Sequence, residues 1–453
     1  MMNNTKPQSG SKQANKAAWA SAMGTTLEWY DFGIYGIVAA LVLNKEFFPT
    51  LDPAIGTIAA FSTFTVGFIA RPVGALVFGA LGDKWGRKNT LIVTLVMTGA
   101  VTVLIGFLPT YAQVGLAAPI ALVALRVLQG IGLGGEWGGS VLLSTEHAPK
   151  GRRSFYGGLM AMGVPLGTLI SYAVFLIITL FVPQEPFLAW GWRIPFIAGA
   201  LILGVGLWIR LGVEETPQFE AAKAQRAVAP EKPLPFGEVF RRYPGKLAIG
   251  TLFAVGSSAV AYVYLTFLLS WASAKVGYST PTLLAGICVG SVVWAATAPI
   301  WASIGDQAGG MRRLFLGWGI VRSLSVIPFF YLVASGDLVL FYIAMGLMGG
   351  IISTTQVPAG AAIASLFPVH VRYTGSSFSY QLGAILGGGI SPLVASALAA
   401  SSLGINGVVA YIVLVSLISA AAGLALSRTG FDTPRGEDEV GNPHIADSAV
   451  SAT

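Results

Sequence analysis

Charged residues are scarce in this chain of 453 residues, since Asp, Glu, Lys and Arg make up 10% of it. Soluble proteins carry about a quarter of their residues as charged groups. Hydrophobic residues make up 54% of the chain, and the mean hydropathy is +0.72. Such a chain cannot cover a water-exposed surface, which excludes disorder, a fibrous protein and an ordinary soluble enzyme. We therefore predict a membrane protein that crosses the bilayer many times.

Cysteine and histidine are also rare, with one cysteine and three histidines in the whole chain. A single cysteine excludes an internal disulfide and any metal site built from several thiolates. The sequence has neither a G-x-x-x-x-G-K-[ST] phosphate loop nor an H-E-x-x-H zinc motif. We therefore expect no metal, no cofactor and no enzymatic activity, and a membrane-embedded enzyme is the least favoured function.

Long apolar segments fill most of the chain, and a helix needs about 20 such residues to cross a hydrocarbon core of about 30 Å. Twelve segments qualify, at 19–43, 55–81, 90–108, 116–144, 154–182, 190–211, 246–273, 280–304, 314–334, 338–367, 375–402 and 405–427. The predicted fold class is an all-α membrane protein with 12 transmembrane helices.

A long hydrophilic stretch divides these segments into six and six. The halves repeat each other, because G-D-K-W-G-R-K (82–88) follows the second segment and G-D-Q-A-G-G-M-R-R (305–313) follows the eighth. Repeated halves are typical of transporters, with the substrate site between them near the middle of the bilayer. The expected organisation is a disordered cytoplasmic arm (1–16), an N-terminal six-helix bundle (17–212), a central cytoplasmic loop (213–245), a C-terminal six-helix bundle (246–427) and a cytoplasmic tail (428–453).

The basic residues predict the orientation in the membrane. With the N-terminus inside, most of the 27 Lys and Arg residues fall on the inner side, and only Lys45, Arg193 and Lys275 fall on the outer side. Cytoplasmic loops retain basic residues during insertion, so we predict a protein of the cell membrane with both termini in the cytoplasm. The net charge of +7 is then topological, and we expect no nucleic-acid partner.

Two spaced motifs carry a resemblance to a known superfamily. G-A-L-G-D-K-W-G-R-K (79–88) matches the loop between helices two and three of the major facilitator superfamily. L-Q-G-I-G-L-G (128–134) matches a second motif, followed at the superfamily's spacing by Glu146 and Arg153. The resemblance implies the major facilitator fold, in which two six-helix halves rock around a central site.

Further segments resemble the metabolite:H+ symporter family within that superfamily. They are L-E-W-Y-D-F-G-I-Y-G (27–36), A-R-P-V-G (70–74), G-G-E-W-G-G (134–139), W-G-W-R-I-P-F (190–196) and E-E-T-P-Q-F (214–219). Members move small organic acids such as shikimate, 2-oxoglutarate and citrate, or zwitterions such as proline and betaine, together with protons. The stretch N-K-E-F-F-P (44–49) looks most like the shikimate-type branch.

Six charged residues fall deep within the predicted helices. The acids are Glu28, Asp31 and Glu136, and the bases are Arg71, Arg126 and Arg322. Each would cost about 2.5–3.5 kcal/mol at the centre of a lipid-facing helix. They must therefore face one another, water or the protein interior, and the equal numbers of acids and bases favour pairing.

Glu28 and Asp31 are the candidates for proton coupling. Residues three apart share one face of a helix, with Cβ atoms about 6 Å apart. Two desolvated carboxylates that close resist double ionisation, so that one of them binds a proton at working pH. We favour Asp31, which lies deeper in the first helix. The alternative is a structural ion pair with Arg71 or Arg126.

Arg71 is the candidate ligand for a substrate carboxylate, because a guanidinium near mid-depth can donate two parallel hydrogen bonds to it. Arg126, nearer the outer side, either assists or pairs with the first helix. For both, a salt bridge to a deep acid is the alternative, and Arg322 receives no role. The remaining candidate substrate-binding residues, chosen by depth and polarity, are Glu136, Tyr30, Tyr35, Gln356 and Gln381.

The resemblance also implies a gate on the cytoplasmic side. Its predicted members are Asp83, Gly86, Arg87, Glu146 and Arg153. Asp83 can face the positive N-terminus of a neighbouring helix, while Arg87 and Lys88 offer charges to Glu146. The alternative is that the basic members only fix topology. In the second half, Gly310 and Met311 stand where the first loop has Arg87 and Lys88, which weakens the prediction of a gate there.

The sequence therefore predicts a secondary active transporter that carries a small organic acid, shikimate-like or dicarboxylate-like, together with protons. The expected partners are the substrate, protons and the lipid bilayer, and we expect the monomer to be functional. One alternative is a symporter of zwitterionic osmolytes such as proline or betaine. Another is a membrane sensor that binds a ligand without transporting it.

Overall fold

The computed structural model describes residues 8–216, 219–220 and 236–427, and all regular structure in these residues is helical. Among them, 11 helices are long and apolar enough to cross a membrane. The first helix, α1 (Gln8–Val38), is less apolar because it carries two acids, and it completes the predicted set of twelve. The expected fold class is confirmed.

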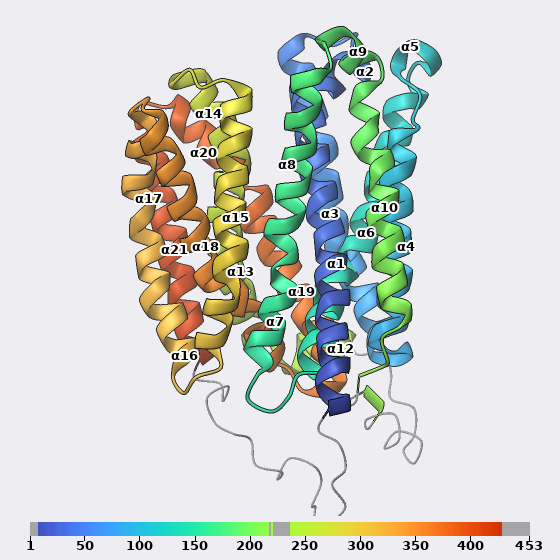
Figure 1. Ribbon diagram of the computed structural model, residues 1–453, viewed down its shortest axis with the longest axis vertical. Coiled ribbons are helices and arrows are strands. Elements are labelled where there is room, and N and C mark those ends of the chain that lie inside the picture. Colours follow the sequence, from blue (N-terminus) through green and yellow to red (C-terminus); the bar gives the residue numbers. More distant parts are fainter. Residues whose placement is uncertain (1–7, 217–218, 221–235, 428–453) are drawn as a thin grey trace, which may run out of the picture.

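The first six membrane helices form one bundle, on the right of Figure 1. They are α1 continued by η1 (Ala39–Leu43), α3 (Pro53–Trp85), α4 (Arg87–Gly106), α6 (Ala117–Glu146), α7 (Arg153–Ala161) continued by α8 (Gly163–Phe181), and α10 (Ile194–Leu211). Short helices connect them: α2 (Asn44–Glu46), α5 (Tyr111–Val114), α9 (Gln184–Ala189) and η2 (Gly191–Arg193).

The last six membrane helices form the second bundle, on the left of Figure 1. They are α13 (Pro244–Tyr262) with η3 (Val263–Phe267) and α14 (Leu268–Lys275), α15 (Thr280–Gly305), α16 (Gly310–Arg312) with η4 (Arg313–Trp318) and α17 (Gly319–Ala334), α18 (Leu338–Ser365), α19 (Arg372–Ala384) with η6 (Ile385–Gly389) and α20 (Ser391–Ala400), and α21 (Gly404–Ser427). Two short helices, α12 (Phe236–Arg242) and η5 (Val369–Val371), lie outside the membrane helices.

The predicted disordered arm is wrong for residues 8–16, which are helical. Ala14 and Ala18 are buried against Tyr156, whose hydroxyl donates to Asn15 Oδ1 at 3.0 Å. These tertiary contacts stabilise a helical extension that composition alone does not indicate. Residues 1–7, most of the central loop and the predicted tail lie outside the described residues.

The two ends of the molecule differ in charge. We call the end that holds the connections after α3, α6, α15 and α18 the basic end, and Figure 1 shows that α1 begins there. The other end, called the opposite end, holds α2, α5 and α9.

Close contact between α3 and α6 brings two of the deep arginines together. A Cβ atom added to Gly134 would collide with the backbone carbonyl of Arg71, and one added to Gly130 would collide with that of Gly67. Small residues at this spacing let two helix backbones touch within a membrane. Arg71 on α3 and Arg126 on α6 are therefore held on facing helices.

Candidate functional site

Asp31, Arg71 and Arg126 line one small cavity in the N-terminal bundle. The cavity lies between α1, α3 and α6 and has a volume of about 10 Å³. Such a space accommodates about one water molecule. The other lining residues are Phe32, Gly67, Phe68, Gln129, Gly130 and Leu133. The structure therefore brings together one predicted proton site and both predicted carboxylate ligands.

Asp31 is held by partners on both carboxylate oxygens. Its Oδ2 lies 3.5 Å from Arg126 Nη1, and its Oδ1 accepts a hydrogen bond of 2.8 Å from the Thr102 hydroxyl. Gln129 donates to the same hydroxyl at 2.9 Å and accepts from Arg126. Asp31 is only 3% exposed, so this closed circle of hydrogen bonds offsets the cost of burying the charges.

Glu28 forms a separate pair with the other arginine. Its Oε1 lies 3.2 Å from Arg71 Nη1, and the Arg71 guanidinium lies 4.5 Å from the centre of the Phe68 ring. The second oxygen of Glu28 is buried and accepts no hydrogen bond from the described residues. Glu28 and Asp31 therefore share one face of α1, as predicted, and each pairs with a different arginine.

The partner of Glu136 is an arginine that the charge pattern did not place among the deep bases. Arg210, near the end of α10, is 1% exposed and forms an ion pair with Glu136. The Thr94 hydroxyl donates to Glu136 at 2.8 Å, and Arg210 donates to the carbonyl of Leu91 at 2.7 Å. Glu136 does not line the cavity, so this third pair fastens α4, α6 and α10 inside the bundle.

The two candidate tyrosines differ in position. Tyr35 lies beneath Arg126, whose guanidinium is 3.2 Å from the centre of its ring, and its hydroxyl bonds to Thr63. Tyr30 donates its hydroxyl to the carbonyl of Pro195 on α10, so it faces the bundle core and does not line the cavity. Only Tyr35 therefore supports the cavity residues directly.

The two candidate glutamines lie in the C-terminal bundle. Gln381 on α19 is fully buried and faces the carbonyls of Leu133 and Gly134 across the boundary between the bundles, at 3.4 and 3.5 Å. Gln356 on α18 is partly exposed, and its side chain makes no hydrogen bond within the described part of the chain. Neither residue lines the small cavity.

Arg322 on α17, which received no role from the sequence, is buried among hydroxyl groups. It donates to Ser257 at 3.1 Å, to Thr355 at 2.6 Å and to Ser419 at 3.4 Å. No carboxylate within the described residues forms an ion pair with it. The expected pairing of three acids with three bases therefore fails at Arg322, because Arg210 takes its place.

An aromatic cluster between the bundles covers the cavity. The ring of Tyr262, on α13, lies 4.9 Å from the ring of Phe32 and 5.7 Å from that of Phe68, measured between centres. Both phenylalanines line the cavity. A second contact between the bundles stacks Trp137 on Tyr380, with ring centres 3.7 Å apart and planes inclined by 3°.

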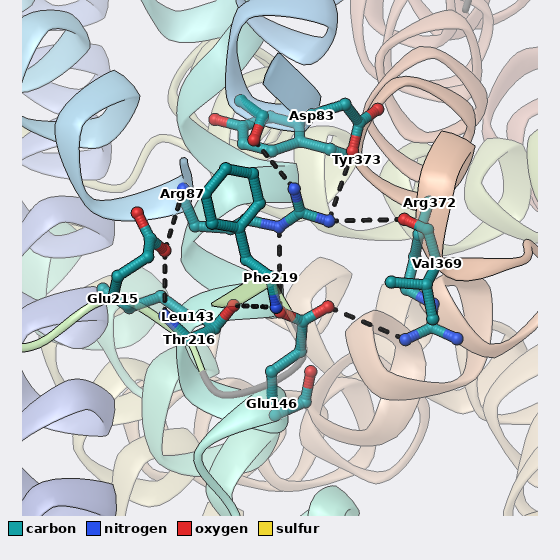
Figure 2. Close-up of polar contacts among 12 residues, drawn as sticks. Asp83, Arg87, Leu143, Glu146, Glu215, Thr216, Phe219, Val369, Arg372 and Tyr373 are labelled. Carbon is teal, nitrogen blue, oxygen red and sulfur yellow. Dashed lines mark hydrogen bonds and ion pairs between the residues drawn. The ribbon is translucent and has the colours of Figure 1, made fainter. Parts of the chain in front are cut away.

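A network of charges joins the bundles at the basic end (Figure 2). Asp83 accepts from the Thr374 backbone N–H and hydroxyl at 3.3 and 3.0 Å, and so caps the start of α19. Arg87 lies 3.2 Å from Asp83 and 3.7 Å from Glu146. Glu146 in turn lies 3.7 Å from Arg372. The network thus contains three of the five predicted gate residues as charged members.

The predicted role of Arg153 in this network is wrong, because its side chain is exposed and makes no ion pair within the described residues. Arg372, at the equivalent point of the second half, occupies that place. Gly86 contributes through its backbone conformation. Its φ of 109° is one that residues with a side chain rarely adopt. Lys88 does not reach Glu146, since its ammonium group donates to the carbonyl of Leu211 at 3.2 Å.

Glu215 is a member that residue-by-residue reasoning missed. Its carboxylate accepts from the backbone N–H groups of Arg87 and Lys88 at 3.0 and 3.2 Å, and so caps the start of α4. It also occupies the space that a side chain at Gly86 would need. The E-E-T-P-Q-F segment drew attention to this region of the sequence, but its spacing does not indicate which helix Glu215 caps.

A second contact at the basic end involves no ion pair among the described residues. Asp306, which follows α15, accepts from the backbone N–H groups of Ser154 and Phe155 at 2.7 and 2.8 Å, at the start of α7. Burial raises the pKa of this half-buried carboxyl from 3.8 to about 6, against the opposing effects of those two N–H groups and Arg152. The contact of Asp306 with α7 is equivalent to that of Asp83 with α19. The repeated G-D motif contains both acids, but no contact was predicted for Asp306.

Comparisons with known proteins agree with this architecture. The family model described as "Major Facilitator Superfamily" matches residues 21–380. The chain belongs to the major facilitator superfamily. The shikimate transporter of Escherichia coli (strain K12) is 36% identical over 431 residues, which cover 93% of this chain and 97% of that protein.

Two further members of the superfamily extend the comparison. The proline/betaine transporter of Salmonella typhimurium is 32% identical, over 91% of this chain and 83% of that protein. Among solved structures, the proton:xylose symporter XylE with bound 6-bromo-6-deoxy-D-glucose has a TM-score of 0.73 at 16% identity, covering 93% of this chain and 96% of that chain. That likeness shows the fold, and the chain is a multi-pass membrane transporter of the major facilitator type.

Proposed function

We propose that this protein carries a small organic acid together with protons across the cell membrane. The basic end then faces the cytoplasm, as the distribution of Lys and Arg predicts. The single observation that carries the proposal is that Asp31, Arg71 and Arg126 line one cavity in which both arginines are already paired with acids.

Competition for the arginines couples proton and substrate. A substrate carboxylate needs a free guanidinium, and Arg126 is held by Asp31. A proton on Asp31 removes the charge that holds Arg126 and so frees it for the substrate. Arg71, which pairs with Glu28, supplies the second guanidinium for the substrate. Release of the proton on the other side of the membrane restores the ion pair and expels the substrate.

Transport requires the two bundles to separate on alternate sides. The cavity of about 10 Å³ is far below the ~300–1,000 Å³ of typical ligand sites. Residues 17–212 and 246–427 rock against each other, with the residues of Figure 2 closing the cytoplasmic side. Separation at the opposite end lifts Tyr262 from Phe32 and Phe68 and so opens the cavity.

Uptake into proteoliposomes with an imposed proton gradient tests the proposal. The panel contains shikimate, aromatic acids, dicarboxylates, tricarboxylates, proline and betaine. We expect uptake of one or more organic acids that an uncoupler abolishes. Ligand binding with no uptake of any compound would instead indicate a sensor, and uptake that is insensitive to the uncoupler would contradict symport.

A zwitterionic substrate is the second candidate, supported by the likeness to the proline/betaine transporter of Salmonella typhimurium. Acids at the central site could receive an ammonium group while Arg71 binds the carboxylate. The same panel separates the two functions, because proline or betaine would then be taken up and shikimate would not. The excess of guanidinium over carboxylate groups lining the cavity favours the organic acid.

A further inference from the structure

A larger cavity lies at the opposite end of the N-terminal bundle. Its volume is about 360 Å³, and it lies between the end of α4, the turn into α5, and the start of α10. Its lining residues are Glu46, Gly106, Phe107, Leu108, Pro109, Thr110, Gln113, Ala189, Trp190, Arg193 and Ile197. Figure 1 places α4 and α10 at the outer edge of this bundle, away from the C-terminal bundle. The cavity is therefore separate from the central site.

Two opposite charges line this cavity without forming a direct ion pair. Arg193 is 9% exposed and donates to the carbonyls of Leu108 and Ala189 at 2.9 and 3.3 Å, which leaves further N–H groups of its guanidinium available. Glu46 on α2 is partly exposed. These two described residues form no ion pair within 4.0 Å, so both charges remain available to a ligand.

The surroundings of the cavity are those of a membrane surface. Trp190 and Phe107, which line it, are 57% and 65% exposed, and aromatic residues are enriched at the headgroup level. Below them, α10 presents Leu201, Val205 and Trp208 at 74%, 47% and 78% exposure. Their spacing places them on one side of the helix, where they form an apolar path for acyl chains.

We propose that this cavity binds the headgroup of a zwitterionic phospholipid, with Arg193 holding the phosphate and Glu46 the ammonium group of phosphoethanolamine. Arg193 supplies donors that match phosphate oxygens. Glu46 supplies the opposite charge within the same cavity, and the exposed side of α10 receives the acyl chains. A wholly anionic headgroup would meet the repulsion of Glu46, so this site selects the zwitterion.

Native mass spectrometry of the delipidated full-length protein tests the proposal. Phosphatidylethanolamine or phosphatidylglycerol is added, and the fraction of protein carrying one lipid is measured. We expect the wild type to favour phosphatidylethanolamine by about fivefold, the effect of roughly one surface charge. Glu46→Lys reverses that preference, because the second cation attracts the anionic lipid. Arg193→Lys weakens binding of both lipids, because it keeps the charge but loses the planar donor set.

The matched control is Glu185→Gln, which removes an exposed acid of α9 that does not line the cavity. It should leave the lipid preference unchanged. Equal binding of both lipids by the wild type, or an unchanged preference in Glu46→Lys, would overturn the proposal. Thermal stabilisation by free phosphoethanolamine equal to that by the whole lipid would assign the cavity to a soluble zwitterion and also overturn it.

Discussion

The two bundles share one architecture but differ in how they bury charge. In the N-terminal bundle, three arginines face three acids. In the C-terminal bundle, Arg322 faces Ser257, Thr355 and Ser419. Thr355 precedes Arg372 by the same distance as Glu136 precedes Arg153, so a hydroxyl stands where the first half has an acid.

This difference indicates that the buried charges of the two bundles have different roles. An acid–arginine pair can be broken by a proton or by a competing carboxylate, whereas a guanidinium held by neutral hydroxyls has no group to neutralise at working pH. We infer that the N-terminal bundle carries both coupling and recognition, while Arg322 stabilises the packing of α13, α17, α18 and α21. Substitutions of these buried residues in the two bundles should therefore behave differently.

The largest expected effect is on transport. Arg71→Lys should lower uptake efficiency by roughly 10²-fold, because lysine cannot donate the two parallel hydrogen bonds, and losing hydrogen bonds between charged groups costs about 1.5–3 kcal/mol. Arg322→Lys should leave the KM for the substrate unchanged, since it does not line the central cavity. Initial rates of uptake in proteoliposomes measure both. A similar rise in KM for the two variants would remove the distinction between the bundles.

The next effect is on stability. Glu136→Gln leaves Arg210 buried without its acid and should lower the free energy of unfolding by about 3–5 kcal/mol. Thr355→Val removes one hydroxyl from Arg322 and should cost about 1.5–3 kcal/mol, as expected for a hydrogen bond to a charged group. Thermal unfolding of the purified variants in one detergent gives the order. An equal loss in both would show that the ion pair contributes no more than a hydroxyl.

The two contacts at the basic end form a smaller comparison. Asp83→Asn should open this end roughly tenfold more often, since each tenfold corresponds to about 1.4 kcal/mol and Asp83 also holds Arg87. Asp306→Asn should change opening by less than about threefold, because the amide loses one of the two accepted N–H bonds but also removes a charge that burial disfavours. A cysteine at Ser377, buried against Gly138, reports opening by its labelling rate once Cys288 is replaced by serine.

The labelling of Ser377→Cys has a direct control. Replacing Glu185, which is exposed at the opposite end, should not change the rate. If Asp306→Asn accelerates labelling as much as Asp83→Asn does, the charge network adds nothing to closure.

The smallest effect is a dependence on pH. The pKa of Asp306 is raised to about 6 by burial at the contact, and a carboxyl in water has its ordinary value of 3.8. Between these two pH values, Asp306 is more often protonated in the closed contact than in the open state. Closure is therefore stabilised as pH falls from about 6 towards 4, and it loses that stabilisation as pH rises through 6. The ratio of labelling rates, Asp306→Asn over the parent, should therefore rise as pH falls. A constant ratio would contradict this.

The sequence predicted the fold because helix length, hydropathy and basic loops follow from composition. It also identified Asp31, Arg71 and Arg126, since any charge within an apolar segment must find a partner. It could not assign partners, because those depend on how helices rotate and pack. Arg210 lies at the end of the predicted segment 190–211, where a basic residue is expected to face the cytoplasm, yet it is buried against α4 and α6.

The Asp306 contact was also not predicted, and neither was the pairing of Glu146 with Arg372 in place of Arg153. Both join residues more than a hundred positions apart, and only the pseudo-repeat relates them. Comparing the two halves position by position would have indicated both. The helical start of α1 was missed because its stabilising contacts with Tyr156 are tertiary.

Proton movement measured during substrate uptake tests the central claim most directly. A pH-sensitive dye enclosed in proteoliposomes reports acidification when an organic acid is added outside. The account predicts acidification with the wild type, and none with Asp31→Asn, which should still exchange labelled for unlabelled substrate. Acidification by Asp31→Asn equal to that of the wild type would contradict the assignment of proton coupling to Asp31.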